Sequence, residues 1–396
     1  MSFNDLKFPL LAMSDPAGGG AACVFEAKVL FAWRRQPLLV PARDPRYAHA
    51  AVRFFVGNPL LRGLGHLLLT LDRCVPRAEI LPLFRWEGFP AAALFGENAA
   101  ADASHAVLCG SPGPLQKLTI LCQPGDGLAP RVAKVAVQPS ADMAVALEEH
   151  WLHELGHLPQ IAAFLPRLAN AGALASGRRF VAMSALPAGG GAMRFGHAHR
   201  QFLLALGAQS GVHPWSDTEA FNRLRARALA VRPMMKAEHR ALIDAALHEV
   251  EQRIGVCRLP ACLAHGDFAP WNVRVQAGRL FAFDWEYAQA GANPLHDFLH
   301  FHLMSRLARH RPLGTRYMAP LLSRAGRHAD SVFGVRSGVA EAAGALAMHY
   351  LLDVITFYVE ASRCLDPRHP VLRAYLRLLE QRGQWLATGA AIGGRT

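Results

Sequence analysis

Residues 265–286 constrain this chain more than any other stretch, because they set two carboxylates and an amide at fixed separations. Asn272 follows Asp267 after four residues, and Asp284 comes after a further short apolar segment. Two apolar runs around a Gly-containing turn predict a β-hairpin between Asn272 and Asp284. We therefore expect the hairpin to carry Asp284 beside Asn272, with all three side chains turned towards one cleft.

These three side chains are the groups that phosphoryl transfer from a nucleoside triphosphate needs. A carboxylate must orient the attacking hydroxyl and take its proton, and the position of Asp267 suits that role. Amide and carboxylate oxygens hold Mg²⁺, which makes Asn272 and Asp284 the candidate metal ligands. The alternative is a solvated loop followed by an ordinary strand, and five fixed positions at two fixed spacings weigh against it.

The same stretch carries a family resemblance. The residues involved are His265-Gly-Asp267-x4-Asn272 followed by Asp284-Trp-Glu286. This string resembles the catalytic core of the aminoglycoside phosphotransferase and choline kinase families, over about residues 105–300. The resemblance implies an α+β, bilobal protein-kinase-like fold with a small antiparallel-sheet lobe and a larger helical lobe. It also implies that Asp267 is the catalytic base and that ATP and Mg²⁺ are the cofactors.

Three apolar runs, at residues 105–109, 117–122 and 131–137, predict antiparallel strands that resemble the small ATP-binding lobe of the family. The turn between the first two contains Gly110, Ser111 and Gly113. By itself such a string is only a turn. Its place two strands before a Val-Ala-Lys sequence favours a loop that covers the phosphates.

Lys134 ends that Val-Ala-Lys sequence, so its ammonium would reach the α- and β-phosphates, and Ala133 is counted with it among the nucleotide-binding residues. An edge-strand lysine facing water is the alternative. A helix is predicted over residues 141–156. On it, Glu148 resembles the family glutamate that orients this lysine, and Glu149 is an adjacent alternative that the sequence leaves open.

Residues 180–184 predict the last strand of the small lobe, and residues 185–191 resemble the hinge that offers backbone groups to adenine. Ser184 and Leu186 are therefore candidate nucleotide contacts. Asp297 resembles the family aspartate that hydrogen-bonds the backbone of the catalytic loop. That loop would also be supported by His265.

The resemblance divides the chain into three parts: residues 1–100, an N-terminal extension of unknown role; 101–186, the small ATP-binding lobe; and 187–396, the large catalytic and substrate-binding lobe. Small and polar residues before Ser104 read as a linker. We therefore expect a core that folds and binds ATP without residues 1–95.

Composition narrows the partners and the compartment. The net charge is +12, but the basic residues are scattered without a nucleic-acid motif, so nucleic acid is not an expected partner. Seven cysteines without CxxC spacing favour free thiols in the cytoplasm. No apolar run is long enough to span a bilayer, and no signal peptide is recognisable. The oligomeric state is unknown from the sequence.

Three histidines, His296, His300 and His302, fall on a predicted helix. The first two share one face at a spacing that a zinc site could use. Neither an HExxH string nor a third ligand accompanies them, so buried, hydrogen-bonded histidines are the favoured interpretation.

Taken together, the sequence favours a small-molecule kinase that phosphorylates a hydroxyl group. Carboxylates in residues 195–260 look dispersed among basic neighbours, which disfavours a polycationic antibiotic and favours a neutral or anionic metabolite, such as a sugar. The alternatives are a kinase-like nucleotide-binding regulatory protein without turnover, and a basic adaptor that docks through its first hundred residues.

Overall fold

The computed structural model describes residues 24–75, 80–96, 103–124, 128–186 and 194–393. They form two compact units. The described residues before Ala192, together with Arg274–Tyr287, make the first unit. The described parts of Ala192–Val273 and Ala288–Thr396 make the second.

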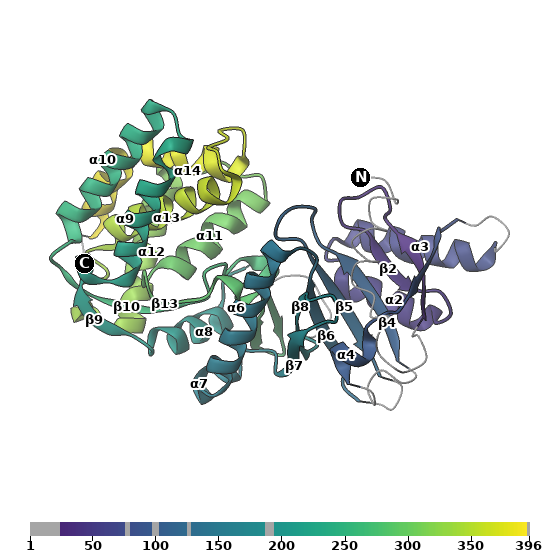
Figure 1. Cartoon of the computed structure of the whole chain (residues 1–396). Coiled ribbons are helices and arrows are strands. Elements are labelled where there is room, and N and C mark those ends of the chain that lie inside the picture. Colours follow the sequence, from purple (N-terminus) through teal and green to yellow (C-terminus); the bar gives the residue numbers. More distant parts are fainter. Residues whose placement is uncertain (1–23, 76–79, 97–102, 125–127, 187–193, 394–396) are drawn as a thin grey trace. The chain divides into compact units, whose positions relative to one another are not determined.

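Within the described residues, the first unit is built on an eight-stranded antiparallel sheet with the order β3-β1-β2-β4-β5-β6-β8-β7 (Figure 1). The strands are β1 Val24–Leu30, β2 Leu38–Pro41, β3 Leu83–Glu87, β4 Ser104–Cys109, β5 Lys117–Gln123, β6 Arg131–Ala136, β7 Leu168–Ala173 and β8 Arg179–Ser184. Alternate residues of each strand face opposite sides of a sheet, so this one has a core face and a second face that carries the site described below.

Helices and a hairpin complete the first unit. The helices are α2 Pro45–Phe55, α3 Pro59–Cys74, α4 Ala91–Phe95, α6 Pro139–Gly156 and α7 Pro159–Ala162. The hairpin pairs β11 Val273–Gln276 with β12 Arg279–Ala282, and the short 3-10 helix η5 Trp285–Tyr287 follows it. Proline at the start of α2, α3, α6 and α7 suits the first helical turn, where the missing N–H has no partner to lose.

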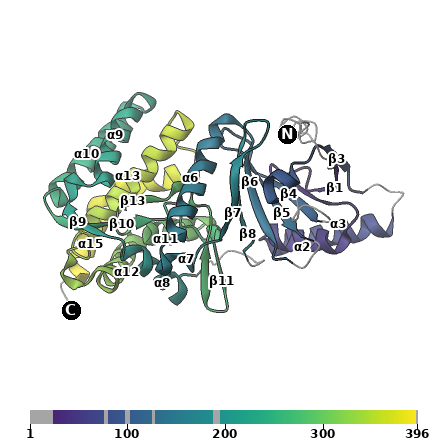
Figure 2. The ribbon, with the colours of Figure 1, turned by 60° about the horizontal axis from the view of Figure 1, so that its bottom comes forward.

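The N-terminal strands belong to the same sheet as the predicted small lobe. Strand β2 pairs with β4, with Leu38 opposite Leu108, and β1 lies between β2 and β3. Figure 2 shows β1 and β3 at the same end of the sheet as β4. Their side chains share one core, in which Trp86 and Phe89 pack in the same cluster as Ile120 and Val135. Residues from both sides of the boundary that the sequence suggested at residue 100 therefore share one sheet and one core.

The predicted strands of the small lobe are confirmed as β4, β5, β6 and β8, and the helix predicted from residue 141 is confirmed as α6. Strand β7 was not predicted. Its sequence, Leu-Ala-Asn-Ala-Gly-Ala, lacks the β-branched and aromatic residues that favour strands, and its pairing with β8 makes it a strand.

The second unit is mostly helical. Its helices are α8 His197–Gly207, α9 Glu219–Val231, α10 Ala237–Ile254, α11 His296–Ala308, α12 Thr315–Phe333, α13 Ala343–Ser362, α14 Pro370–Glu380 and α15 Arg382–Gly393. Three strands form a small sheet: β9 Gly211–Pro214, β10 Arg258–Ala264 and β13 Gln289–Ala292. Short 3-10 helices lie at Trp215–Asp217, Arg232–Met234, Pro270–Asn272 and Val335–Ser337. Helix α13 is buried along most of its length and is the centre of this unit.

The expected fold class is confirmed, with one unit on an antiparallel sheet and one mostly helical unit. Across the described part of the chain, no helix combines the length and the apolar character needed to cross a membrane.

Candidate functional site

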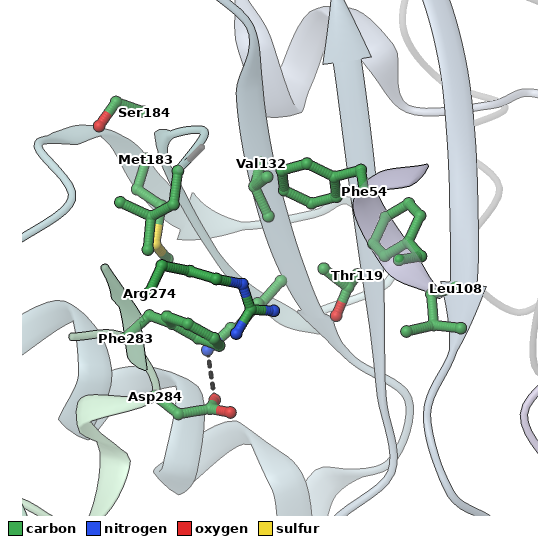
Figure 3. A pocket seen from close by; sticks show the side chains of 12 residues that line it. Phe54, Leu108, Thr119, Val132, Met183, Ser184, Arg274, Phe283 and Asp284 are labelled. Atoms are coloured by element: carbon green, nitrogen blue, oxygen red, sulfur yellow. Dashed lines mark hydrogen bonds and ion pairs between the residues drawn. The ribbon is translucent and has the colours of Figure 1, made fainter. Parts of the chain in front are cut away.

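A cavity of about 220 Å³ opens on the second face of the large sheet (Figure 3). Alternate residues of neighbouring strands form its floor: Leu108, Thr119, Val132, Lys134 and Met183. Arg274, Phe283 and Asp284 from the hairpin region line it, as do Ser184 and Leu186 after β8. Two further lining residues, Phe54 and Phe55, end helix α2. The cavity is thus largely apolar with charged groups at Lys134, Arg274 and Asp284.

Lys134 and Glu148 are brought together, as the sequence suggested. The Lys134 ammonium donates to both carboxylate oxygens of Glu148, at 2.6 and 2.8 Å. Glu148 is fully buried because it shares the inner face of α6 with Val145 and Leu152. Glu149, one position on, points elsewhere and pairs with Arg179 at 2.6 Å.

Asp284 also contacts the Lys134 ammonium, as the dashed line in Figure 3 marks. The lysine therefore has two carboxylate partners, Glu148 and Asp284. Asp284 has a φ of 69°, a left-handed backbone conformation that is uncommon outside glycine. Two contacts hold the hairpin that leads to it: the Ala282 N–H donates to the Phe164 carbonyl, and the Arg279 guanidinium donates to the Ala163 carbonyl. The chain that enters Asp284 is therefore fixed on its N-terminal side.

A second ion pair lies in the same unit, between Lys117 on β5 and Glu286 on η5. Burial raises the pKa of Glu286, and the Lys117 ammonium opposes that rise. Burial by itself lowers the pKa of Lys134, but the carboxylates of Asp284, Glu148 and Glu286 outweigh it, and the net shift is upward. Lys134 therefore stays charged at every physiological pH.

Two lysines and three carboxylates meet in this cluster: Lys117 and Lys134 with Glu148, Asp284 and Glu286. The cavity lining adds the Arg274 guanidinium, so positive and negative groups are equal in number. Carboxylate oxygens are the ligands that a hard divalent cation prefers. Asp284 is the most exposed of the three carboxylates, with 31% of its side chain accessible, and it lines the cavity.

The glycine turn after β4 has a structural explanation. A Cβ on Gly110 would overlap the Lys117 carbonyl oxygen, so glycine is required for the tight approach of the two strands. The Ser111 hydroxyl accepts a hydrogen bond from Gln36 at 2.8 Å. Gly110, Ser111 and Gly113 are not among the residues that line the cavity. Their contact with phosphates stays a prediction.

The expectation for Ala133 needs correction. Side chains alternate along β6, so Ala133 faces the core on the opposite side of the sheet from Lys134. Val132 lines the cavity in its place. Ser184 and Leu186 line the cavity as well, while the rest of the proposed hinge, residues 187–191, lies outside the described residues.

The loop that carries Asp267 and Asn272 belongs to the second unit. Asn272 donates from Nδ2 to Oδ2 of Asp267 at 2.7 Å and to the Asp267 carbonyl at 3.0 Å. Asn272 is buried, and the Asp267 side chain is 29% exposed. The two residues five positions apart are therefore brought together, with the carboxylate accessible and the amide behind it.

Helix α11 holds the backbone of that loop. Asp297 accepts hydrogen bonds from the N–H groups of His265, at 2.7 Å, and Gly266, at 3.1 Å, which confirms its predicted role. His296 contacts the Gly266 carbonyl at 3.0 Å through Nε2. Gly266 has a φ of 82°, and glycine adopts this conformation without strain.

His300 was not predicted as a site residue, yet its Nε2 lies 2.8 Å from Oδ1 of Asp267. His296 and His300 face the catalytic loop together from one side of α11. Within the described ranges, no group of three His, Cys, Asp or Glu side chains is placed to hold a metal ion.

Other residues in or near the cavity were missed for different reasons. Phe54 and Phe55 lie in the extension, for which no role was predicted. Glu286 was part of the Asp-Trp-Glu string, but its partner Lys117 is 169 residues away. The His296 to His300 spacing, beside an aspartate predicted to bind the catalytic loop, is the one signal that could have placed His300 at the site.

Several solved structures are similar to this chain. No match was found among curated proteins. Among solved structures, the chain is similar to a putative fructosamine-3-kinase from Thermobifida fusca, with 20% identity over 73% of this chain and 99% of that one and a TM-score of 0.47. It is also similar to aminoglycoside phosphotransferase APH(4)-Ia, with 16% identity over 72% and 93% of the two chains and a TM-score of 0.46. The amicoumacin kinase hAmiN, bound to AMP-PNP, Ca²⁺ and Ami, shows 11% identity over 68% and 86%, with a TM-score of 0.46.

The family comparison is decisive. The model described as "Phosphotransferase enzyme family" matches residues 118–332, more than half of this 396-residue chain. The matched range contains Lys134, Glu148, Asp267, Asn272 and Asp284. The chain belongs to the phosphotransferase enzyme family.

Proposed function

We propose that this phosphotransferase moves the γ-phosphoryl group of ATP, together with Mg²⁺, to a hydroxyl group of a small molecule. One observation carries the proposal: Lys134, held by buried Glu148 and contacting Asp284, lies at the polar part of a largely apolar cavity. A nucleotide-binding site needs an apolar wall for the adenine ring and, beside it, charged groups for the phosphates.

The donor set fits the two cofactors. Carboxylate and amide oxygens are the ligands that Mg²⁺ prefers, and Asp284 and Asn272 supply them. When bound, the metal ion would neutralise charge on the phosphates. Lys134 would bind the α- and β-phosphates, while Glu148 fixes its position and Ser184 and Leu186 line the part of the cavity next to the predicted hinge.

Asp267 would orient the acceptor hydroxyl and take its proton. Its carboxylate already accepts hydrogen bonds on both oxygens from protein groups, and each oxygen has a further lone pair for an acceptor hydroxyl. An oriented, partly exposed carboxylate is what a general base requires.

The charges of the second unit favour a neutral or anionic acceptor. Four carboxylates of this unit are bound to arginines: Glu219 to Arg223, Asp244 to Arg232, Glu249 to Arg253 and Arg382, and Asp353 to Arg227. Burial raises the pKa of Tyr350, Tyr358 and Tyr375, and the Asp267 charge adds to that rise. A sugar or related polyol fits this environment.

The test is turnover of radiolabelled ATP with Mg²⁺ across a panel of neutral sugars, anionic metabolites and aminoglycosides. We expect label on a neutral or anionic hydroxyl compound and none on the aminoglycosides. Nucleotide binding without transfer to any compound would favour the regulatory alternative. A chain that binds no nucleotide by calorimetry would overturn the proposal altogether.

A further inference from the structure

We infer that His300 is a positioning residue that fixes the carboxylate of Asp267 through a hydrogen-bonded chain reaching Tyr350 and Tyr375. The inference rests on the proposed function, in which Asp267 is the base. It gives a role to a histidine that the sequence placed only on a buried helix.

The first step is the geometry at the carboxylate. Oδ1 of Asp267 lies 2.8 Å from Nε2 of His300, and Oδ2 accepts from Nδ2 of Asn272 at 2.7 Å. One donor on each oxygen fixes the plane of the carboxylate as well as its position. Removing either donor would leave the carboxylate free to rotate about the Cβ–Cγ bond. A general base must hold one orientation towards the acceptor hydroxyl, so this rotation would slow proton transfer.

The second step is the tautomer of His300. An ionised carboxylate only accepts hydrogen bonds, so the proton between Asp267 and His300 belongs to Nε2. The other ring nitrogen, Nδ1, lies 3.1 Å from the Tyr350 hydroxyl. In the neutral ring Nδ1 is an acceptor, so Tyr350 donates to it and thereby holds the proton of His300 on the nitrogen that faces Asp267.

The third step is what holds Tyr350. Its hydroxyl lies 2.9 Å from that of Tyr375, and both rings are fully buried. Burial raises the pKa of both tyrosines, so their hydroxyls keep their protons and remain able to donate. The chain joins three helices, since His300 lies on α11, Tyr350 on α13 and Tyr375 on α14.

The ring of His300 is also held from its side. His296, one turn earlier on α11, stacks against it with centroids 5.9 Å apart and planes 8° apart. His296 itself contacts the Gly266 carbonyl beside Asp267. His296 therefore contacts the backbone of this loop, and His300 contacts its functional side chain, the carboxylate of Asp267.

The experiment uses the full chain with His300→Gln, His300→Ala and Tyr350→Phe, measured for Mg·ATP turnover with water and with neutral sugars as acceptors. Glutamine places an N–H donor near the position of Nε2, so we expect it to keep most of the turnover. We expect His300→Ala to lower kcat about 10–100-fold, the usual effect of losing a partner that orients a functional ligand. In His300→Ala the KM for ATP should not change, and added imidazole should restore part of the lost kcat. Tyr350→Phe should lower kcat less than His300→Ala does.

His302→Ala is the matched control, because His302 lies two positions on along α11 among aromatic rings, where burial is the largest of the effects that lower its pKa. It should match His300→Ala in lost thermal stability but not in lost turnover. Equal turnover in His300→Ala and the parent, or a loss that neither glutamine nor imidazole relieves, would show that His300 only packs.

A failure of the proposed function would look different. Asp267→Asn with full turnover would remove Asp267 as the base, whatever His300 does. If no acceptor supports turnover, nitrogen NMR of isotope-labelled histidine decides the positioning chain alone. We expect the resonance that His300→Gln removes to report a protonated Nε2 and to shift in Tyr350→Phe. A protonated Nδ1 in its place would overturn the inference.

Discussion

Glu148 accepts hydrogen bonds on both carboxylate oxygens from a single group, the Lys134 ammonium, at 2.6 and 2.8 Å. The carboxylate is fully buried, and the lysine side chain is 9% exposed. A buried charge of this kind persists only when it is paired. The pair therefore fixes the lysine in the cavity floor, where Asp284 is its second partner.

Lys134→Ala should weaken the binding of ATP far more than the binding of adenosine. A hydrogen bond to a charged group contributes about 1.5–3 kcal/mol, which corresponds to a loss of roughly 10- to 150-fold for ATP. Adenosine, which has no phosphate, should bind about as before. Calorimetry with both ligands measures the difference, and equal losses would point to a folding role for Lys134.

Glu148→Gln should show a milder form of the same defect, because the lysine keeps Asp284 as a partner. Glu149→Gln is the matched control on the same helix, since Glu149 pairs with Arg179. A double-mutant cycle between Lys134 and Glu148 should be non-additive, whereas one between Lys134 and Glu149 should be additive.

Asp284→Ala should remove the dependence of nucleotide binding on Mg²⁺. Asp284 is the carboxylate that lines the cavity, and a hard divalent cation needs an anionic oxygen ligand. Titration of ATP with and without Mg²⁺ should separate parent and variant, with the metal-free affinities remaining similar. Glu286→Ala is an informative neighbour, because Glu286 is buried against Lys117 and should chiefly cost stability. A variant of Asp284 with the parental magnesium dependence would exclude it as the metal ligand.

Phe54→Ala together with Phe55→Ala should weaken both ATP and adenosine. The two rings line the cavity from the end of α2. Their removal would delete apolar surface against which the adenine ring would pack. Losing contact with one aromatic side chain costs a stacked base about 1–3 kcal/mol, or roughly 5- to 150-fold in affinity. Leu60→Ala is the control, since that side chain is 86% exposed on the next helix. Affinity for adenosine that survives the double substitution would mean that the nucleotide does not reach α2.

This protein should unfold in acid at a higher pH than carboxylate protonation alone would produce. Burial lowers the pKa of His105, His199, His328 and His349 to about 4. Between about pH 6.5 and 4 the unfolded chain therefore binds more protons than the folded one, so stability falls as the pH falls. Each such histidine adds at most about 1.4 kcal/mol per pH unit to that slope. Urea unfolding between pH 7 and 5 measures it.

His105→Phe is the variant that isolates one of these groups. His105 lies among Phe25, Phe89 and Phe95, with its ring centre 4.9 Å from that of Phe89. Phenylalanine should fit there and reduce the slope by one histidine's contribution. His153→Gln, at an exposed position on α6, should leave the slope as it is. A slope identical in parent and His105→Phe would mean that this histidine does not stay neutral in the folded state.

The sequence was most informative where function depends on local spacing. Asp267 and Asn272 are five residues apart on one loop, and their spacing predicted that they lie together. The apolar pattern around Lys134 predicted the strand that carries it. The alternation of β6 could have excluded Ala133, because residues next to each other on a strand face opposite sides. The contact between His300 and Asp267 could not be predicted in this way, since it depends on how α11 packs against the loop.

Deleting residues 1–95 is the sharpest test of what the extension does. The sequence alone favoured a core that folds without it. The sheet favours the opposite outcome, because the deletion removes β1, β2 and β3 and leaves the edge of β4 unpaired. It also removes Trp86 and Phe89 from the core cluster that Ile120 shares, and the exposed apolar face and free edge favour aggregation. We expect residues 96–396 to be insoluble or to melt without cooperativity. A shorter deletion of residues 1–23, which keeps every strand that the described residues form, is the control and should fold and bind ATP. Soluble expression of residues 96–396 with a cooperative melt that Mg·ATP raises would show that β4 to β8 suffice for the nucleotide-binding unit.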